Sequence, residues 1–337
     1  MTLIERSFYP GTTETIDDLK KEYGMTGTEY VFTSMQLNHD SFKWMTSLFD
    51  SGYQVITDIS KETLRALDMT VEMLYQKYPQ IICRLDDGNS EAEILSLSER
   101  HAVILNASTV SDTLLEKINS KHKISAMFNY YPKPLTGMTE AAVKELTEKL
   151  QEKGMEVYGF IPGSMSRRGP VHAGLPTIEA HRYDGTIKNY LSLKSLNIDK
   201  VFLGDEYLTE CEVTELAALK DGVLKMKIST EYPDIFEKVN DFKVSARRDQ
   251  SAYLHRFSGT RGQLRKFTLK DSDRVKLISK GDILIDGPET PRYAGEIQIA
   301  RRDAFAGNYP FYKIGETAEE NLLEYIPEQY TIQFEWE

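Results

Sequence analysis

Cysteine is nearly absent from this chain. Its 337 residues include only Cys83 and Cys211, far apart in the sequence, so neither a disulfide framework nor a cysteine metal site is expected. The six histidines show no ligand spacing, and we predict no metal. Cys83 lies in an apolar run and is interpreted as a small core residue.

Long apolar runs and excess positive charge are also missing. No run approaches the about 18 residues of a membrane span, and the opening "MTLIERSFYPG" has no apolar signal region, so we expect a cytoplasmic protein without membrane contact. With 41 basic against 52 acidic residues the net charge is −11, which argues against nucleic acid as a partner. No GxGxxG follows the first apolar run, so no dinucleotide cofactor is expected.

The first two-thirds of the chain alternate short β-branched runs with helical patterns. The predicted strands are 3–9, 29–34, 53–58, 81–86, 102–106, 123–130, 155–161 and 200–204. The predicted helices are 13–22, 40–50, 61–67, 91–99, 112–119, 140–153, 177–196 and 209–219. Eight such units in residues 1–220 predict an α/β fold, a (β/α)₈ barrel that carries the catalytic site.

Residues 221–337 have a different pattern. Strand-like segments such as "VLKMKIST", "DFKVSARR" and "RYAGEIQIARR" follow one another without long helices. They predict a second domain, either an antiparallel sheet or a small closed barrel.

Polar and aromatic residues stand where the predicted barrel strands end. They are Tyr9, Ser34, Asp58, Asp86, Asn106, the run 129–131, Pro162-Gly163 and Gly204-Asp205. Chemistry in this fold sits at the carboxyl ends of the strands. Paired carboxyl groups, amides and aromatic faces are the groups that glycoside hydrolysis needs.

The segment "IICRLDDG" is the most informative strand. Arg84 and Asp86 point the same way because strand side chains alternate. An arginine inside a barrel needs a carboxylate, and Asp58 on the neighbouring strand is the expected partner. A purely structural ion pair remains the alternative, as does a simple turn at Asp205.

Two loops carry cations. In "NYYPKPLTGMTE", prolines hold Tyr131 and Lys133 over the rim. In "FIPGSMSRRGP", Arg167 and Arg168 follow the seventh strand, where this fold often binds phosphate. The alternatives are a rigid loop in the first case and a solvated basic turn in the second.

Taken together, these segments resemble the bacterial 6-phospho-N-acetylmuramidase (MupG) family, formerly an uncharacterised outer-surface-protein family. The resemblance rests on "VFTSMQL", "TDIS", "RLDDG", "LNAST", "NYYPKPLTGM", "FIPGSMSRRGPVHAGLPTIEAHR" and "VFLGD" in order, and on "ARRDQSAYLHRFSGTR", "KGDILID" and "RYAGEIQI" later. It implies a TIM barrel followed by a cyclophilin-like β-barrel. It also implies cleavage of N-acetylmuramic acid 6-phosphate linked β-1,4 to N-acetylglucosamine during cell-wall recycling.

For such a phosphosugar hydrolase each candidate residue has an expected role. Asp86 is the expected catalytic carboxyl, with Asp58 or Asp205 as its partner. The expected substrate-binding residues are Tyr9 and Tyr131 for the sugar, Arg84, Asn106 and Asn129 for polar groups, and Lys133, Arg167 and Arg168 for the phosphate. Whether the mechanism is retaining, inverting or assisted by the substrate's acetamido group stays open.

Three alternatives stay open as well. Phe128 stands where members of the family usually carry histidine, so a phosphosugar sensor without catalysis is the second hypothesis. A phosphosugar isomerase or aldolase is weaker, because an aldolase commonly needs a strand-end lysine. In the second domain, "ARRDQSAYLHRFSGTR" fits a ligand groove or, as we favour, an ion-pair network around Arg248, Asp249 and Arg256; a homodimer contact there is also open.

Overall fold

The computed structural model describes residues 3–9, 15–17, 29–35, 41–85, 88–249, 251–328 and 330–336. Its contacts divide the chain into two compact units, residues 1–214 and 215–337. We call them the barrel unit and the C-terminal unit. The division falls inside helix α9 (Glu210–Lys220).

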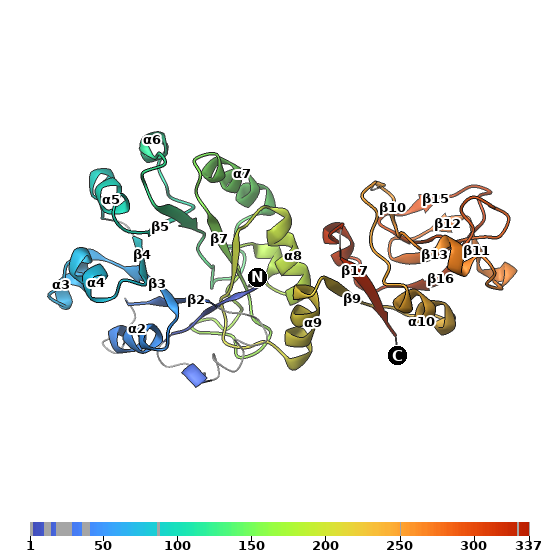
Figure 1. Ribbon diagram of the computed structural model, residues 1–337, viewed down its shortest axis with the longest axis horizontal. Coiled ribbons are helices and arrows are strands. Elements are labelled where there is room, and N and C mark those ends of the chain that lie inside the picture. Colours follow the sequence, from blue (N-terminus) through green and yellow to red (C-terminus); the bar gives the residue numbers. More distant parts are fainter. Residues whose placement is uncertain are drawn as a thin grey trace. The chain divides into compact units, whose positions relative to one another are not determined.

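The barrel unit contains eight parallel strands closed in sequence order, β1 to β8 (Figure 1). They are β1 (Glu5–Ser7), β2 (Tyr30–Ser34), β3 (Gln54–Ile59), β4 (Ile81–Leu85), β5 (Val103–Asn106), β6 (Ile124–Met127), β7 (Val157–Ile161) and β8 (Lys200–Leu203). Pairing of β1 with β8 closes the cylinder, so no strand edge is left open. The predicted (β/α)₈ barrel is confirmed.

The helices lie outside the strands, as Figure 1 shows for α3 to α7. They are α2 (Ser41–Asp50), α3 (Lys61–Ala66), α4 (Val71–Lys77), α5 (Glu91–Ser98), α6 (Asp112–Lys117), α7 (Glu140–Gln151), α8 (Thr186–Ser195) and α9. Side-chain caps begin several of them: Ser90 forms a capping box with Glu93, and Thr139 accepts from the amide of Ala142.

Two predictions for the helices were wrong, and a third is not covered. Helix α4 was missed. The single helix predicted over 177–196 is a 3₁₀ turn, Glu179–His181, followed by a separate α8 that begins after Gly185. Long-range bonds hold the first part, since the amide of Thr177 donates to Phe160 O and the amide of Glu179 donates to Met138 O. The predicted helix over 13–22 lies mostly outside the described residues.

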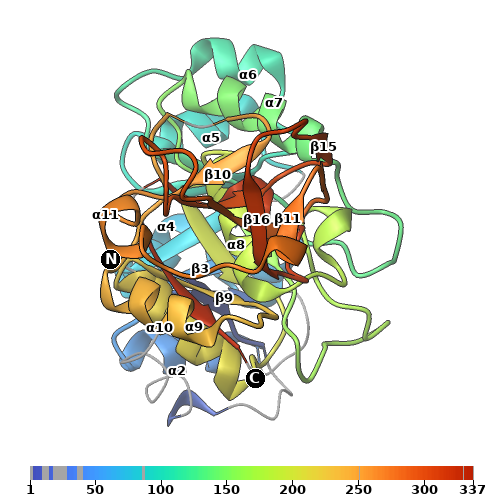
Figure 2. The ribbon, with the colours of Figure 1, turned by 90° about the vertical axis from the view of Figure 1, so that its right-hand side faces the viewer.

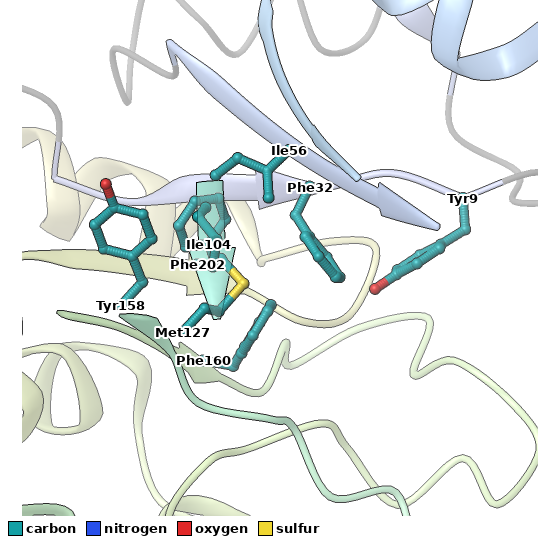
Figure 3. Packing of buried hydrophobic residues seen from close by; sticks show 8 residues of the cluster. All are labelled: Tyr9, Phe32, Ile56, Ile104, Met127, Tyr158, Phe160 and Phe202. Carbon is teal, nitrogen blue, oxygen red and sulfur yellow. The ribbon is translucent and has the colours of Figure 1, made fainter. Parts of the chain in front are cut away.

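Aromatic and aliphatic side chains fill the inside of the barrel (Figure 3). The cluster comprises Tyr9, Phe32, Ile56, Ile104, Met127, Tyr158, Phe160 and Phe202. Alternation along each strand puts one side chain in two into this core. The interior is therefore packed, and only the strand ends remain for chemistry.

The C-terminal unit (Figure 2) is built around an antiparallel five-stranded sheet, which was one of the two predicted alternatives. The sheet has the order β10 (Leu254–Arg256), β14 (Ile297–Ala300), β13 (Asp282–Asp286), β16 (Phe311–Glu316), β11 (Arg274–Val275). Two smaller pairs accompany it: β12 (Leu277–Ile278) with β15 (Ala304–Phe305), and β9 (Val223–Lys227) with β17 (Thr331–Glu335). The unit also holds helices α10 (Pro233–Asp241) and α11 (Arg261–Leu264).

The strand predicted from "DFKVSARR" is wrong. Helix α10 runs into the start of this segment, and only isolated bridges at Ser245 and Ala246 pair the rest. Pro233 at the helix start and the buried face of Ile235, Phe236 and Val239 explain why α10 forms there.

Candidate active site

An arginine, a carboxylate and an amide meet at the ends of three barrel strands. Arg84 on β4 donates from Nη1 to Asp58 Oδ1 on β3 at 2.8 Å, and from Nη2 to Asn129 Oδ1 beyond β6. The Arg84 side chain is 6 % exposed and that of Asp58 is 15 % exposed. The predicted pairing of Arg84 with Asp58 is therefore confirmed.

Arg84 and Asp58 are each expected to destabilise the fold if the other is removed. Removing one partner of a buried pair leaves an uncompensated charge, at a cost of about 3 to 5 kcal/mol. The guanidinium also orients the Asn129 amide, because its Oδ1 accepts from Arg84. The amide's Nδ2 is then the end that a ligand oxygen would meet.

Two tyrosines, Tyr9 and Tyr130, and the guanidinium of Arg168 lie close to one another. The hydroxyl groups of Tyr9 and Tyr130 lie 3.1 Å apart, and the Arg168 guanidinium lies 4.8 Å from the centroid of the Tyr9 ring. Burial, with the neighbouring Tyr130, raises the pKa of Tyr9 well above its ordinary value. Tyr9 is therefore a neutral phenol that packs in the hydrophobic core of the barrel.

Asp205 is fully buried and holds the loop after β7. Its carboxylate accepts three backbone N–H bonds, from Gly163 at 2.9 Å, Arg168 at 2.9 Å and Leu175 at 3.1 Å. A Cβ on Gly163 would lie 2.8 Å from Cβ of Asp205, so this approach requires glycine. Burial raises the pKa of Asp205 although the three amide bonds oppose that shift.

The adjacent arginines lie in different environments. Arg168 is 8 % exposed and donates to Gly204 O at 3.1 Å and Ser7 O at 2.9 Å. Arg167 is half-buried, and its bonds to the carbonyls of Gly163, Ala173 and Arg182 are 3.2 to 3.5 Å long. Long bonds of this kind are weak and can be exchanged for a better acceptor.

Glu179 and Arg182 join the two rim loops, and the sequence reasoning missed them. Arg182 is fully buried and bonds both oxygens of Glu179 at 2.7 Å. It also donates to the carbonyls of Gly174, Tyr131 and Lys133. The acid–x–x–arginine spacing in "EAHR" was the available signal.

The same carboxylate holds the loop after β6. Glu179 accepts the amides of Leu135 and Gly137, both at 2.8 Å. The hydrogen bonds from Arg182, ahead of all other effects, lower the pKa of Glu179 to about 2. Tyr131 and Lys133 thus sit on a loop whose backbone is held by an ion pair, with Tyr131 half-buried and Lys133 exposed.

Of the two remaining candidates, Asn106 and Asp86, the structure describes only Asn106. Asn106 ends β5, is half-buried, and accepts the amide of Ser108 at 3.0 Å. Asp86 lies outside the described residues. Within the part of the chain that the structure does describe, no cluster of three or more His, Cys, Asp or Glu suits a metal ion.

Comparison with known proteins addresses both units. A family profile described as "6-phospho-N-acetylmuramidase, N-terminal" matches residues 6–218, and its C-terminal counterpart matches residues 223–335. The chain belongs to the 6-phospho-N-acetylmuramidase family. This membership places it among the glycosidases.

Solved structures show the same fold. A conserved protein of unknown function from Enterococcus faecalis is 22 % identical with a TM-score of 0.80, covering 99 % of this chain and 96 % of that one. An uncharacterised B. cereus protein is 21 % identical with a TM-score of 0.78, covering 98 % and 99 %. No curated protein matches the sequence.

Among the described helices, none has the length and apolar character needed to cross a membrane.

Proposed function

We propose that this 6-phospho-N-acetylmuramidase family member hydrolyses the β-1,4 bond between N-acetylmuramic acid 6-phosphate and N-acetylglucosamine, in the cytoplasm, during cell-wall recycling. The observation that carries the proposal is the network of Asp58, Arg84 and Asn129 at the barrel mouth of a chain whose two halves both match the family. This network supplies a carboxylate and an oriented amide where this fold performs chemistry.

Asp86 and Asp58 are the proposed pair of carboxyl groups. Asp86 comes directly after Leu85, the last residue of β4, and alternation along the sequence predicts that it points to the same side as Arg84. The positive charge of Arg84 favours the ionised form of Asp58. We therefore assign Asp58 the charged role, as nucleophile, base or electrostatic support, and Asp86 the role of acid.

Asp205 receives a different role from the one the sequence suggested. Both of its oxygens hold main-chain amides, and the side chain is fully buried. We propose that Asp205 is a positioning residue that shapes the loop carrying Arg167 and Arg168. Arg168 also holds that loop in place, because its side chain donates hydrogen bonds to the carbonyls of Ser7 and Gly204.

The phosphate is assigned to Lys133 and Arg167. Lys133 is exposed on the loop after β6, and the weak carbonyl bonds of Arg167 can be replaced by charge-assisted bonds to phosphate. Tyr131 is proposed to contact the sugar, and Asn106 and Asn129 to bind its hydroxyl or acetamido groups.

The Phe128 substitution does not favour the sensor hypothesis. Phe128 is completely buried, and alternation puts it on the opposite side of the chain from Met127 and Asn129, which face the barrel interior. The aromatic ring therefore packs away from the mouth.

The test is incubation of the protein with 6-phospho-N-acetylmuramyl-β-1,4-N-acetylglucosamine, followed by measurement of released reducing sugar. We expect release, and much less from the same disaccharide without phosphate. A shift in melting temperature without any release would contradict hydrolysis and support the sensor.

A further inference from the structure

A buried glutamate in the C-terminal unit gathers three arginines. The Glu296 side chain is 1 % exposed; its Oε1 accepts from Arg256 Nε at 2.9 Å and its Oε2 from Arg261 Nε at 2.6 Å. Arg247 Nη1 lies 3.6 Å from Oε1. The ion-pair network that the sequence predicted is thus present, but it centres on Glu296 and uses Arg247 in place of Arg248.

One further carboxylate belongs to this cluster. Asp249 accepts two parallel bonds from Arg247, at 2.7 and 2.6 Å, and lies 3.5 Å from Arg256. Its side chain is 59 % exposed. An exposed carboxylate on a short loop is an anion that solvent or a competing ligand can replace. At formal charges, three guanidinium groups against two carboxylates leave the cluster positive in a chain of net charge −11.

A groove of about 260 Å³ opens beside these arginines. Its lining residues, among those that the structure describes, are Arg247, Phe257, Ser258, Gly259, Arg261 and Gly262, and none of these is acidic. Arg261 uses Nε and Nη2 for Glu296, and its Nη1 has no hydrogen-bond partner among the described residues. The groove therefore has cationic donors and a hydroxyl on its wall, while the two carboxylates, Glu296 and Asp249, lie behind the arginines and compete for them.

Gly262 adds an independent observation. It lies in α11 with no atom within 4 Å of the place where a Cβ would be, and its φ is not positive. Glycine inside a helix costs about 1 kcal/mol relative to alanine. Neither crowding nor backbone conformation requires glycine here, and the missing side chain leaves the backbone beside the groove accessible to a ligand.

We propose that this groove binds the phosphate of a phosphate monoester, between Arg247 and Arg261. A guanidinium matches two phosphate oxygens with parallel bonds. A dianion also suits a positive cluster better than a single carboxylate does, particularly once the exposed Asp249 swings away from Arg247. The site is formed by the C-terminal unit alone and does not depend on the hydrolysis proposed for the barrel.

The experiment is calorimetric titration of the full chain with N-acetylglucosamine 6-phosphate, inorganic phosphate and N-acetylmuramic acid, which carries a carboxylate and no phosphate. Arg261→Gln should weaken the binding of both phosphate probes at least about 10-fold. Asp249→Asn should strengthen the binding of both phosphate probes, because the substitution removes the carboxylate charge that competes for Arg247. Arg302→Gln, a matched loss of an exposed charge that does not line the groove, should leave binding unchanged.

Gly262→Asp and Gly262→Asn separate a loss of binding from a loss of folding. The two side chains have nearly the same shape and differ in charge, and space is open at that position. Both should melt like the parent, and the aspartate alone should abolish binding at this site through repulsion. Equal binding by Gly262→Asp, Gly262→Asn and the parent would overturn the proposal. Binding of N-acetylmuramic acid as tight as that of the phosphates would overturn the assignment to phosphate.

Discussion

Arg84 shows how one buried cation organises two groups with different chemistry. It holds the Asp58 carboxylate and the Asn129 oxygen at once, so both are fixed before any substrate arrives. Preorganised charge of this kind costs no rearrangement during the reaction. The proposed catalytic function of Asp58 therefore depends on its charge and not on its shape.

Asp58→Asn is the first test at this scale. The substitution keeps an oxygen that accepts from Arg84 but leaves the buried guanidinium without a countercharge, so the melting temperature should fall while the protein still folds. The value of kcat should fall by at least about 100-fold. Asp86→Asn, measured in parallel, should have an effect of similar size. Asp112→Asn, an exposed change on α6, is the matched control. Parent-like turnover by a folded Asp58→Asn protein would remove this carboxylate from the mechanism.

Arg167 and Arg168 should respond differently to replacement by alanine. Arg167→Ala removes weak carbonyl bonds and the proposed phosphate contact, so KM for the phosphorylated disaccharide should rise. The expected loss is about 1.5 to 3 kcal/mol, the range for hydrogen bonds to charged groups. High salt should reduce the difference from the parent.

Arg168→Ala removes a buried support under the same loop, so its main effect should be a lower melting temperature. Initial rates with and without the 6-phosphate, together with melting curves, measure both effects. If Arg167→Ala leaves the preference for the phosphorylated substrate intact, the loop is a solvated basic turn.

The two rim loops behave as one element because Glu179 and Arg182 tie them together. The carboxylate binds amides of the loop after β6, and the guanidinium binds carbonyls of both loops. Neither residue is proposed to touch the substrate. We propose that they position Tyr131, Lys133 and Arg167.

Glu179→Gln tests this positioning role. It removes the charge that faces Arg182, so both loops should loosen, KM should rise several-fold and kcat should change less. Protease cleavage within 131–137 should become faster, a readout that a lost substrate contact alone would not change. Glu145→Gln, on the exposed face of α7, is the control. Unchanged KM and unchanged cleavage would show that the ion pair is dispensable.

At the scale of the whole barrel, stability should depend on pH through Glu5. This carboxyl lies inside the N-terminal end of the barrel, 3 % exposed, where it accepts the amides of Glu29 and Tyr30, both at 2.9 Å. Burial raises its pKa to about 7. The folded state therefore holds a proton that the unfolded chain releases above about pH 4.3.

The proton held by Glu5 stabilises the folded barrel at low pH. This contribution to the free energy of unfolding is fully present below about pH 4.3 and is lost as the pH rises through about 7. The melting temperature should thus fall between pH 5 and 8, and Glu5→Gln should reduce that slope. Asp205 and Asp286 are shifted in the same direction by burial, so part of the slope should remain. Parallel curves for Glu5→Gln and the parent would contradict the assignment.

Local patterns in the sequence were sufficient for the eight barrel strands and for the partnership of Arg84 with Asp58. For the C-terminal unit they left two alternatives, an antiparallel sheet and a small closed barrel, and the structure shows the sheet. Strand periodicity, strand ends and helix caps depend on neighbours in the chain, and a buried charge requires a partner from an adjacent strand. Ser90 and Thr139 begin their helices as predicted for the same reason.

Only the tertiary structure decided what the polar residues of the loops do. Asp205 follows a strand end, as a catalytic carboxylate would, yet amides from residues 30 to 42 positions earlier use both its oxygens. Glu179 was predicted to lie in a helix, but contacts with Met138 and the loop after β6 hold it in a 3₁₀ turn. Such contacts join residues that are distant along the chain, and the closed barrel is what brings them together.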